Sequence, residues 1–253
     1  MPYRGHAAAH PSHMDLFLQG KVVVVTGGTK GIGRAIAAAV LRAGANVGIC
    51  GRNGGEVDRA AAELRKLAPD NARVVGTVCD VTQPDQVRSL FEVVDKNFDG
   101  IDVLVNNAGI GVFAATADLT VEQWRQTMDT NLSGAFYCSR EALRRFRARS
   151  GGYIINISSL AGKNPFAGGA AYNASKFGLN GFSEAMMLDH RHENVRVSYV
   201  MPGSVDTGFG HNSQPSDWKI APSDVAEIVV TLLRMPERTL ISRVEVRPSR
   251  PRK

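Results

Sequence analysis

A tyrosine and a lysine lie four residues apart in the segment Tyr172-Asn-Ala-Ser-Lys176. On a helix, side chains at this spacing lie one turn apart on the same face. A lysine ammonium beside a phenol favours the phenolate, which lowers the tyrosine pKa from about 10 towards neutrality. The pair therefore predicts a proton donor or acceptor at Tyr172. Two such residues on a surface helix are more often unremarkable, so the rest of the chain has to decide.

A glycine-rich turn is the second candidate site. Residues 21–26 form a continuous apolar, β-branched run, which is typical of a strand buried on both faces. Gly27-Gly-Thr-Lys-Gly-Ile-Gly33 follows, and then a helical pattern through Ile36, Val40 and Leu41. A turn of this kind lets the backbone approach a pyrophosphate at the helix N-terminus. Its position between a strand and a helix predicts a dinucleotide site.

The remaining chain alternates between strand-like and helix-like segments. Further strands are expected at residues 46–50, 73–79, 101–105, 153–158, 195–200 and 240–246. Helices are expected at 56–67, 84–97, 121–148, 172–192 and 223–234. The alternation predicts an α/β fold, a Rossmann-like doubly wound parallel seven-stranded sheet with helices on both faces. We expect residues 1–18 to form a flexible N-terminal extension and residues 19–253 a single dinucleotide-binding catalytic domain.

Composition excludes several classes of function. The chain is 43% hydrophobic and 21% charged, which is ordinary for a soluble protein. It has neither a bilayer-length apolar run nor a signal-peptide pattern near its start, so we expect a cytoplasmic protein and no membrane partner. Cys50 and Cys79 end strand-like runs, which predicts reduced, buried thiols. His6, His10 and His13 have helical spacing, but Pro11 interrupts any helix there, and no metal site is predicted.

The formal charge of +6 does not indicate a nucleic-acid partner. Most of it lies in the last eleven residues, where five basic residues face one acidic residue. A basic tail is usually solvated and non-specific, although it could help to attract a phosphorylated substrate.

Several motifs in register resemble the short-chain dehydrogenase/reductase family, in its single-domain branch of about 250 residues. The resemblance covers nearly the whole chain from Gly20 onward. The motifs are Thr26-Gly27-(x3)-Gly31-(x)-Gly33, Asp80-Val81, Asn106-Asn107-Ala108-Gly109, the residues Asn131, Ser159, Tyr172 and Lys176, and Pro202-Gly203 with Thr207.

The resemblance implies roles for these residues. Asn131, Ser159, Tyr172 and Lys176 match the family's catalytic residues. Ser159 is preferred to its neighbour Ser158 because it lies thirteen residues before Tyr172, as the family pattern requires. The residues expected to bind the cofactor are Gly27, Thr29, Lys30, Gly31, Ile32, Gly33, Arg52, Asp80, Val81, Asn107, Ala108, Gly109, Tyr172, Lys176, Pro202, Gly203, Val205 and Thr207.

The residues after the second strand predict NADP(H) as the cofactor. An NAD site normally places an acid about 20 residues after the glycine loop, where it binds the ribose 2′-hydroxyl. This chain has Gly51, Arg52 and Asn53 there, and no acid before Glu56. A guanidinium at Arg52 suits a 2′-phosphate, and Lys30 is placed to reach the same group.

The predicted function is an NADP(H)-dependent oxidoreductase that transfers a hydride between nicotinamide and a carbonyl or secondary alcohol. Its substrate is expected to be a 3-oxoacyl thioester-like or other small apolar ketone. The alternative is a catalytically silent NADP-binding sensor on the same fold. A serine hydrolase is disfavoured because no serine lies in a Gly-x-Ser-x-Gly elbow. Family members acting on nucleotide sugars need a longer region after Thr207.

Two further expectations concern the substrate and the assembly. Candidate pocket walls are Ile110, Val112, Phe166, Phe209 and Trp218, and the alternative for each, above all for Val112 and Trp218, is core packing. Family members are commonly dimers or tetramers, so a homo-oligomer is expected. Phe177, Phe182, Met186 and Met187 give the helix 172–192 more apolar surface than one buried face needs.

Overall fold

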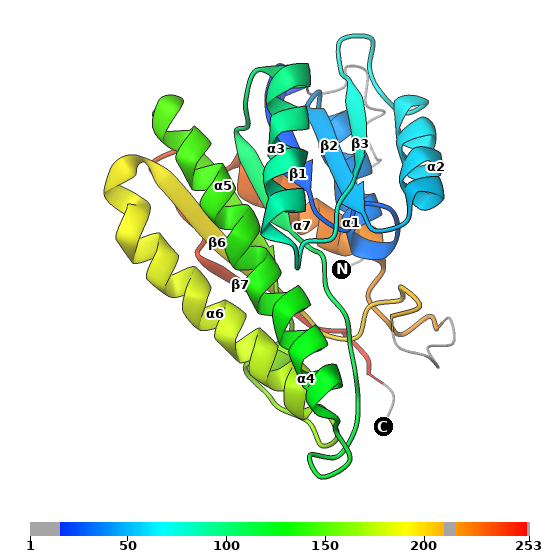
Figure 1. The fold of residues 1–253 in the computed structure, drawn as a ribbon. Helices are drawn as coiled ribbons and strands as arrows, with labels where there is room; N and C mark the ends of the chain where they lie inside the picture. Colours follow the sequence, from blue (N-terminus) through cyan, green and yellow to red (C-terminus); the bar gives the residue numbers. More distant parts are fainter. Residues whose placement is uncertain (1–15, 210–215, 252–253) are drawn as a thin grey trace, which may run out of the picture.

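The computed structural model describes residues 16–209 and 216–251. The flexible extension predicted for residues 1–18 therefore lies almost wholly outside the described residues, as do His6, His10 and His13. Seven parallel strands form one sheet in the order β3-β2-β1-β4-β5-β6-β7 (Figure 1). Their bounds are β1 Val22–Val25, β2 Asn46–Gly51, β3 Val74–Val78, β4 Val103–Asn106, β5 Gly152–Ile157, β6 Val195–Pro202 and β7 Arg243–Val246. The predicted fold class is confirmed.

The helices fall close to their predicted ranges. They are α1 Gly31–Arg42, α2 Gly54–Arg65, α3 Pro84–Phe98, α4 Val121–Met128, α5 Gly134–Ala148, α6 Ala170–His190 and α7 Pro222–Arg234. The single helix predicted over residues 121–148 is wrong in one respect, because a π-helical turn at Asp129–Ser133 separates α4 from α5. The last strand begins at Arg243, three residues later than predicted.

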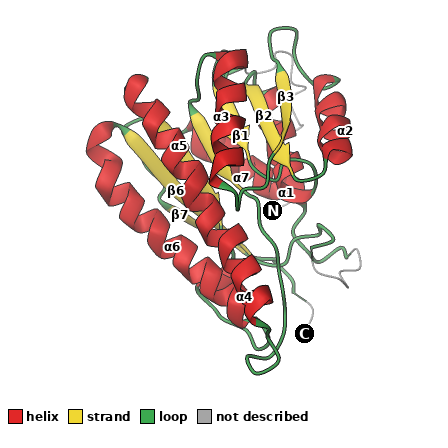
Figure 2. Ribbon diagram, viewed as in Figure 1, coloured by secondary structure: helices red, strands yellow, loops and turns green. Residues whose placement is uncertain are grey.

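Helices cover both faces of the sheet, as Figure 2 shows. One apolar core packs α1, α2 and α7 against the sheet, through Ile36, Leu64 and Val229 among others. The second core packs α3, α5 and α6 on the other face, around Phe91, Phe146 and Met186. Val22–Val25 are all buried because β1 lies between the two cores. Cys50, Cys79 and Cys138 are buried and free, as was predicted for the first two.

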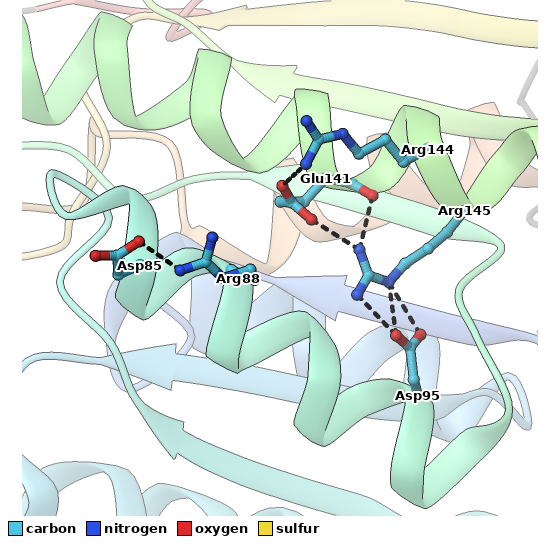
Figure 3. A network of polar contacts seen from close by, with 6 residues as sticks. All are labelled: Asp85, Arg88, Asp95, Glu141, Arg144 and Arg145. Atoms are coloured by element: carbon cyan, nitrogen blue, oxygen red, sulfur yellow. Dashed lines mark hydrogen bonds and ion pairs between the residues drawn. The ribbon is translucent and has the colours of Figure 1, made fainter.

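A charged network links α3 to α5 (Figure 3). The Arg145 guanidinium on α5 forms a bidentate contact with Asp95 on α3, with N–O distances from 2.7 to 3.0 Å. It also donates to a carboxylate oxygen of Glu141 at 3.0 Å, and Arg144 donates to the other oxygen at 2.6 Å. The network holds the two helices side by side on the face that carries α6.

β1 pairs with β2 on one side and with β4 on the other. From β1 the chain first adds strands β2 and β3 on one side of the sheet, and then adds β4 to β7 on the other side. In open parallel sheets, ligands bind at such a switch point, beyond the carboxyl ends of the strands. Among the described residues, no helix is both long and apolar enough to span a membrane.

Candidate active site

The loops after β1 and β4 are held together by Thr26. Its hydroxyl accepts hydrogen bonds from the backbone N–H groups of Asn107 and Ala108, each at 3.0 Å. In return, the Asn107 amide donates to the carbonyl oxygens of Thr26 and Gly27 at 3.0 and 3.1 Å. Two of the predicted cofactor motifs therefore form one rigid unit at the switch point.

The glycine loop leaves no room for a side chain at Gly28 or Gly33. A Cβ on Gly33 would lie 2.3 Å from the Asn107 amide nitrogen and 2.3 Å from the Gly27 carbonyl oxygen. Gly27 and Gly31 have φ angles of 63° and 55°, which L-residues with side chains rarely adopt. The loop ends at the first turn of α1, where unpaired N–H groups favour an anion. These residues fit the pyrophosphate of a dinucleotide.

The end of β2 lies against the same loop. The backbone N–H of Gly28 donates to the Cys50 carbonyl at 3.1 Å, and a Cβ on Gly51 would lie 2.8 Å from the Thr29 methyl group. Arg52 is exposed just beyond, and the Lys30 ammonium lies 4.0 Å from a carboxylate oxygen of Glu56. The two predicted phosphate ligands thus lie at one edge, together with an acid.

Asp80 and Val81 follow β3 at the same end of the sheet. The Asp80 carboxylate accepts from the backbone N–H and the hydroxyl of Thr82, at 3.0 and 2.9 Å. Val81 is buried beneath Gly134, whose Cβ would lie 2.8 Å from a Val81 methyl group. The turn that presents Asp80 is therefore fixed before α3 begins.

Ser159 lies beside Tyr172, and its hydroxyl acts to lower the pKa of the Tyr172 phenol. Ser159 follows β5 and also accepts from the Ala161 N–H at 3.1 Å, which fixes its side chain. Its neighbour Ser158 is buried and faces α6 instead, where its hydroxyl donates to the Asn180 amide oxygen at 2.5 Å. Of the two serines, only Ser159 reaches the tyrosine.

The electrostatics of Tyr172 and Lys176 differ from the prediction. The pair does share one face of α6, with the Lys176 ammonium 5.8 Å from the centre of the Tyr172 ring. However, burial raises the pKa of Tyr172, and only the Ser159 hydroxyl opposes that rise. The predicted pKa depression by Lys176 is wrong here because the ammonium donates to the Ile157 carbonyl at 3.0 Å rather than to the phenol. Burial in turn lowers the pKa of Lys176 to about 8.

Asn131 lies in the π-helical turn between α4 and α5. Its amide oxygen accepts from the Ile110 N–H at 2.8 Å, and its amide nitrogen donates to the Ile110 carbonyl at 2.9 Å. The same nitrogen donates to the Ser175 hydroxyl at 3.0 Å, one residue before Lys176. Asn131 thus joins the loop after β4 to the helix that carries the Tyr/Lys pair.

The segment after β6 leads from the glycine loop to Tyr172. Gly203 donates to the Val246 carbonyl at 2.8 Å, and Val205 forms a bridge with Ile220. Thr207 approaches Gly31, because a Cβ there would lie 3.4 Å from the threonine side chain. The Thr207 hydroxyl accepts from the Phe209 N–H at 3.2 Å. Pro202 is buried at the end of β6.

Three phenylalanine rings surround Tyr172. Phe113, Phe166 and Phe209 have ring centres 5.7, 6.4 and 5.9 Å from that of Tyr172. Phe166 and Phe209 were predicted as pocket walls, and Phe113 was missed. The signal for Phe113 was its position four residues after Gly109, in a loop of small residues. Ile110, Val112 and Trp218, the other predicted pocket walls, are partly buried.

Among the described residues, no cluster of histidine, cysteine or acidic side chains could hold a metal ion. The site residues instead gather where β1, β3, β4, β5 and β6 end, and they combine a phosphate cradle with a hydroxyl pair and a buried amine.

Comparisons with known proteins agree with this geometry. A model of the family described as short chain dehydrogenase matches residues 21–218. An uncharacterized oxidoreductase of Staphylococcus aureus strain N315 is 33% identical over 232 residues, which cover 91% of this chain and 98% of the relative. A solved metagenomic short-chain oxidoreductase in complex with NADP is 34% identical, with a TM-score of 0.81, covering 92% of this chain and 99% of that chain. A variant of actinorhodin polyketide ketoreductase with NADPH is 30% identical, with a TM-score of 0.82, covering 90% of this chain and 96% of that chain.

Proposed function

Because the chain belongs to the short-chain dehydrogenase/reductase family, we propose that it is an NADP(H)-dependent ketone reductase. The observation that carries the proposal is the placement of Tyr172 and Lys176 on one face of α6, with the ammonium 5.8 Å from the ring centre and Ser159 beside the phenol, next to a glycine loop shaped for a pyrophosphate. When bound, NADPH supplies the hydride, and the side chains at this edge supply a proton and orientation.

Tyr172 is the proton donor in this proposal. Its raised pKa keeps the phenol protonated at neutral pH, which is the state that reduction of a carbonyl requires. The proton passes from the Tyr172 hydroxyl to the carbonyl oxygen as the carbonyl carbon receives the hydride, and a secondary alcohol results. The Ser159 hydroxyl stabilises the negative charge that develops on that oxygen. Lys176 carries a positive charge below pH about 8, and its ammonium lies 5.8 Å from the centre of the Tyr172 ring.

The remaining site residues position these groups. Asn131 holds the loop after β4 against α6, and Asp80 lies in a turn fixed by Thr82, where we propose that it meets the adenine. Pro202, Gly203, Val205 and Thr207 are proposed to close over the nicotinamide. NADPH is the proposed cofactor because Arg52 and Lys30 flank the loop; the two solved relatives described above, with NADP and NADPH, support this choice.

A catalytically silent sensor remains the second candidate, and the site disfavours it. A protein that only binds the dinucleotide has no use for a protonated, partly buried tyrosine beside the Ser159 hydroxyl. Turnover separates the two candidates.

The test is the substitution Tyr172→Phe, which removes one hydroxyl and keeps the ring among its neighbours. Reduction of a ketone panel with NADPH is expected to slow by roughly 10²–10⁴-fold, while the affinity for NADPH stays within about twofold. Turnover is measured by NADPH absorbance and affinity by calorimetry. Ser158→Ala is the matched control, because that hydroxyl faces Asn180 and should be silent in catalysis. A Tyr172→Phe enzyme with wild-type turnover would rule out the proposed donor.

A homo-oligomer is also proposed. Val121, Phe136, Phe177 and Leu188 expose apolar surface on α4, α5 and α6, with 65%, 41%, 45% and 57% of their surface accessible. Isolated exposed apolar residues are normal, but four on one helical layer favour an interface. A groove of about 310 Å³ between α5 and α6 lies on the same layer.

A further inference from the structure

Phe113, Phe166 and Phe209, which we name the aromatic cluster, are exposed although each ring already packs near Tyr172. They keep 48%, 45% and 42% of their surface accessible to solvent. Covering the apolar surface of a large side chain removes it from water, which lowers the free energy of the complex. All three lie in loops beside Tyr172, so a ligand that reaches the proton donor would cover them.

The rings are arranged to receive another ring. The interplanar angles are 56° between Phe113 and Phe166, and 73°, 49° and 52° between Tyr172 and Phe113, Phe166 and Phe209. None of these pairs is stacked face to face. Aromatic groups prefer edge-to-face and offset geometries with centres about 4.5–7 Å apart. Tilted rings at these distances therefore leave faces and edges for an additional aromatic partner.

Two glycines make the arrangement possible. A Cβ on Gly111 would lie 2.7 Å from both the Phe113 Cζ and the Phe209 Cε1 atoms. A Cβ on Gly169 would lie 2.6 Å from the Phe166 Cε2 atom. The three rings therefore pack directly against the backbone of Gly111 and Gly169. An alanine at either position would place a methyl group where a ring lies. The cluster is preformed by three separate chain segments.

We propose that the substrate is an aryl ketone, whose ring packs within the aromatic cluster while its carbonyl oxygen meets Tyr172 and Ser159. This inference rests on the proposed function and narrows its substrate class. The reaction is unchanged: the ketone carbon receives the hydride that NADPH supplies, the oxygen receives the Tyr172 proton, and an aryl carbinol leaves. A straight-chain 3-oxoacyl thioester offers no ring to the cluster and is the poorer substrate.

The first experiment compares acetophenone with cyclohexyl methyl ketone, which have the same carbon skeleton. Intrinsic reactivity differs between the two, so the informative quantity is the ratio of their kcat/KM values in each variant divided by the wild-type ratio. Phe113→Leu, Phe166→Leu and Phe209→Leu keep an apolar side chain and remove the ring. Each is expected to lower the aryl-to-cyclohexyl ratio by roughly two- to tenfold, chiefly through KM for acetophenone.

Two further variants make the result specific. Gly111→Ala should lower the same ratio, because its methyl group displaces two of the rings. Phe136→Leu is the matched control: its ring is 41% exposed, but it contacts Tyr137 and Phe182 on α5 and α6. That control should leave the ratio unchanged. A ratio that does not move in the cluster variants, or that moves equally in Phe136→Leu, overturns the inference while leaving ketone reduction intact.

A binding experiment separates this inference from the proposed function. Acetanilide and N-cyclohexylacetamide are amides that a ketone reductase does not reduce, and they differ only in the ring. Calorimetry with the NADPH-bound wild-type protein should show tighter binding of acetanilide, and Phe113→Leu should remove the difference. Preferential binding without any ketone turnover would defeat the proposed function and leave the ligand class standing. Equal binding of both amides would overturn the ligand class.

Discussion

Arg52 and Lys30 approach the proposed 2′-phosphate site in different ways. Lys30 shares the site with Glu56, whose carboxylate lies 4.0 Å away and offsets its charge. Arg52 is exposed at the end of β2 and offers a planar donor that binds phosphate bidentately. We therefore expect cofactor choice to depend more strongly on Arg52 than on Lys30.

The substitution Arg52→Ala tests this choice. It should lower kcat/KM for NADPH by about 10- to 100-fold, since hydrogen bonds to charged groups contribute about 1.5–3 kcal/mol. The value for NADH, which lacks the phosphate, should change by less than about twofold. Steady-state kinetics with both cofactors provide the measurement, and Arg59→Ala, an exposed arginine on α2, is the control. Wild-type enzyme that uses NADH as efficiently as NADPH contradicts the assignment.

Lys176 makes stability depend on pH in a predictable direction. Burial lowers its pKa from 10.5 to about 8 in the folded state. Between these values the unfolded chain binds more protons than the folded one, so the unfolding free energy rises with pH. The full gain is about 3 kcal/mol above pH 10.5, and it is lost as the pH falls through about 8.

The measurement is a series of urea unfolding curves from pH 7 to pH 10.5 for the wild-type protein and for Lys176→Met. The difference in unfolding free energy between the two should rise with pH in favour of the wild type, because methionine has no proton to lose. Subtracting the variant removes the contribution of groups common to both. A difference that stays constant over this range would show that Lys176 titrates normally.

At the scale of elements, α3 and α5 are joined by Arg145. The side chains of Glu141 and Arg145 are only 9% and 18% exposed, whereas Arg88 and Asp85 form an exposed pair on α3 (Figure 3). Removing one partner of a buried charged network leaves the other without compensation, whereas exposed pairs contribute little. The two pairs therefore allow a matched comparison.

Arg145→Ala should lower the unfolding free energy by about 1–3 kcal/mol. Arg88→Ala should change it by no more than about 0.5 kcal/mol. Urea denaturation at pH 7 measures both. Equal effects of the two substitutions would mean that burial of the network is unimportant.

Elements whose sequence pattern reflects burial were predictable, and elements set by tertiary contacts were not. The run Val22–Val25 predicted β1 because a strand between two cores must be apolar on both sides. The π-helical turn around Asn131 has no comparable signal. It depends on hydrogen bonds with Ile110, twenty-one residues earlier, and on Ser175, forty-four residues later.

The candidate site shows the same division. The spacing of Tyr172 and Lys176 placed both side chains on one face of α6. It could not reveal that burial would outweigh the neighbouring charge at Tyr172, since desolvation depends on rings from distant loops. Phe113 was missed for the same reason, because its contact with Tyr172 spans fifty-nine positions of sequence.

At the scale of the whole molecule, the proposed assembly depends on the layer formed by α4, α5 and α6. Met186 was expected to add to its apolar surface, but it is 3% exposed and belongs to the core. Phe177 is accessible as expected, and Phe136 and Leu188 are accessible as well. Sedimentation at micromolar concentration should therefore show a dimer or tetramer rather than a 27.2 kDa monomer. Phe136→Glu and Phe177→Glu together should shift the protein towards the monomer, whereas a monomeric wild type would exclude this interface.

The central position of β1 has a consequence for synthesis. Of the seven strands of this sheet, β1 leaves the ribosome first. It nevertheless pairs with β4, and the Val22 backbone N–H donates to the carboxylate of Asp102, eighty positions later. Synthesis adds about 5–20 residues per second, so one edge of this apolar strand stays unpaired for roughly 4–16 s until β4 has been made. During that interval β1 presents four valines and unpaired backbone groups to other nascent chains. The central position of β1 places the glycine loop at the switch point. For the same reason, the nascent chain is prone to aggregation until residue 106 has been added.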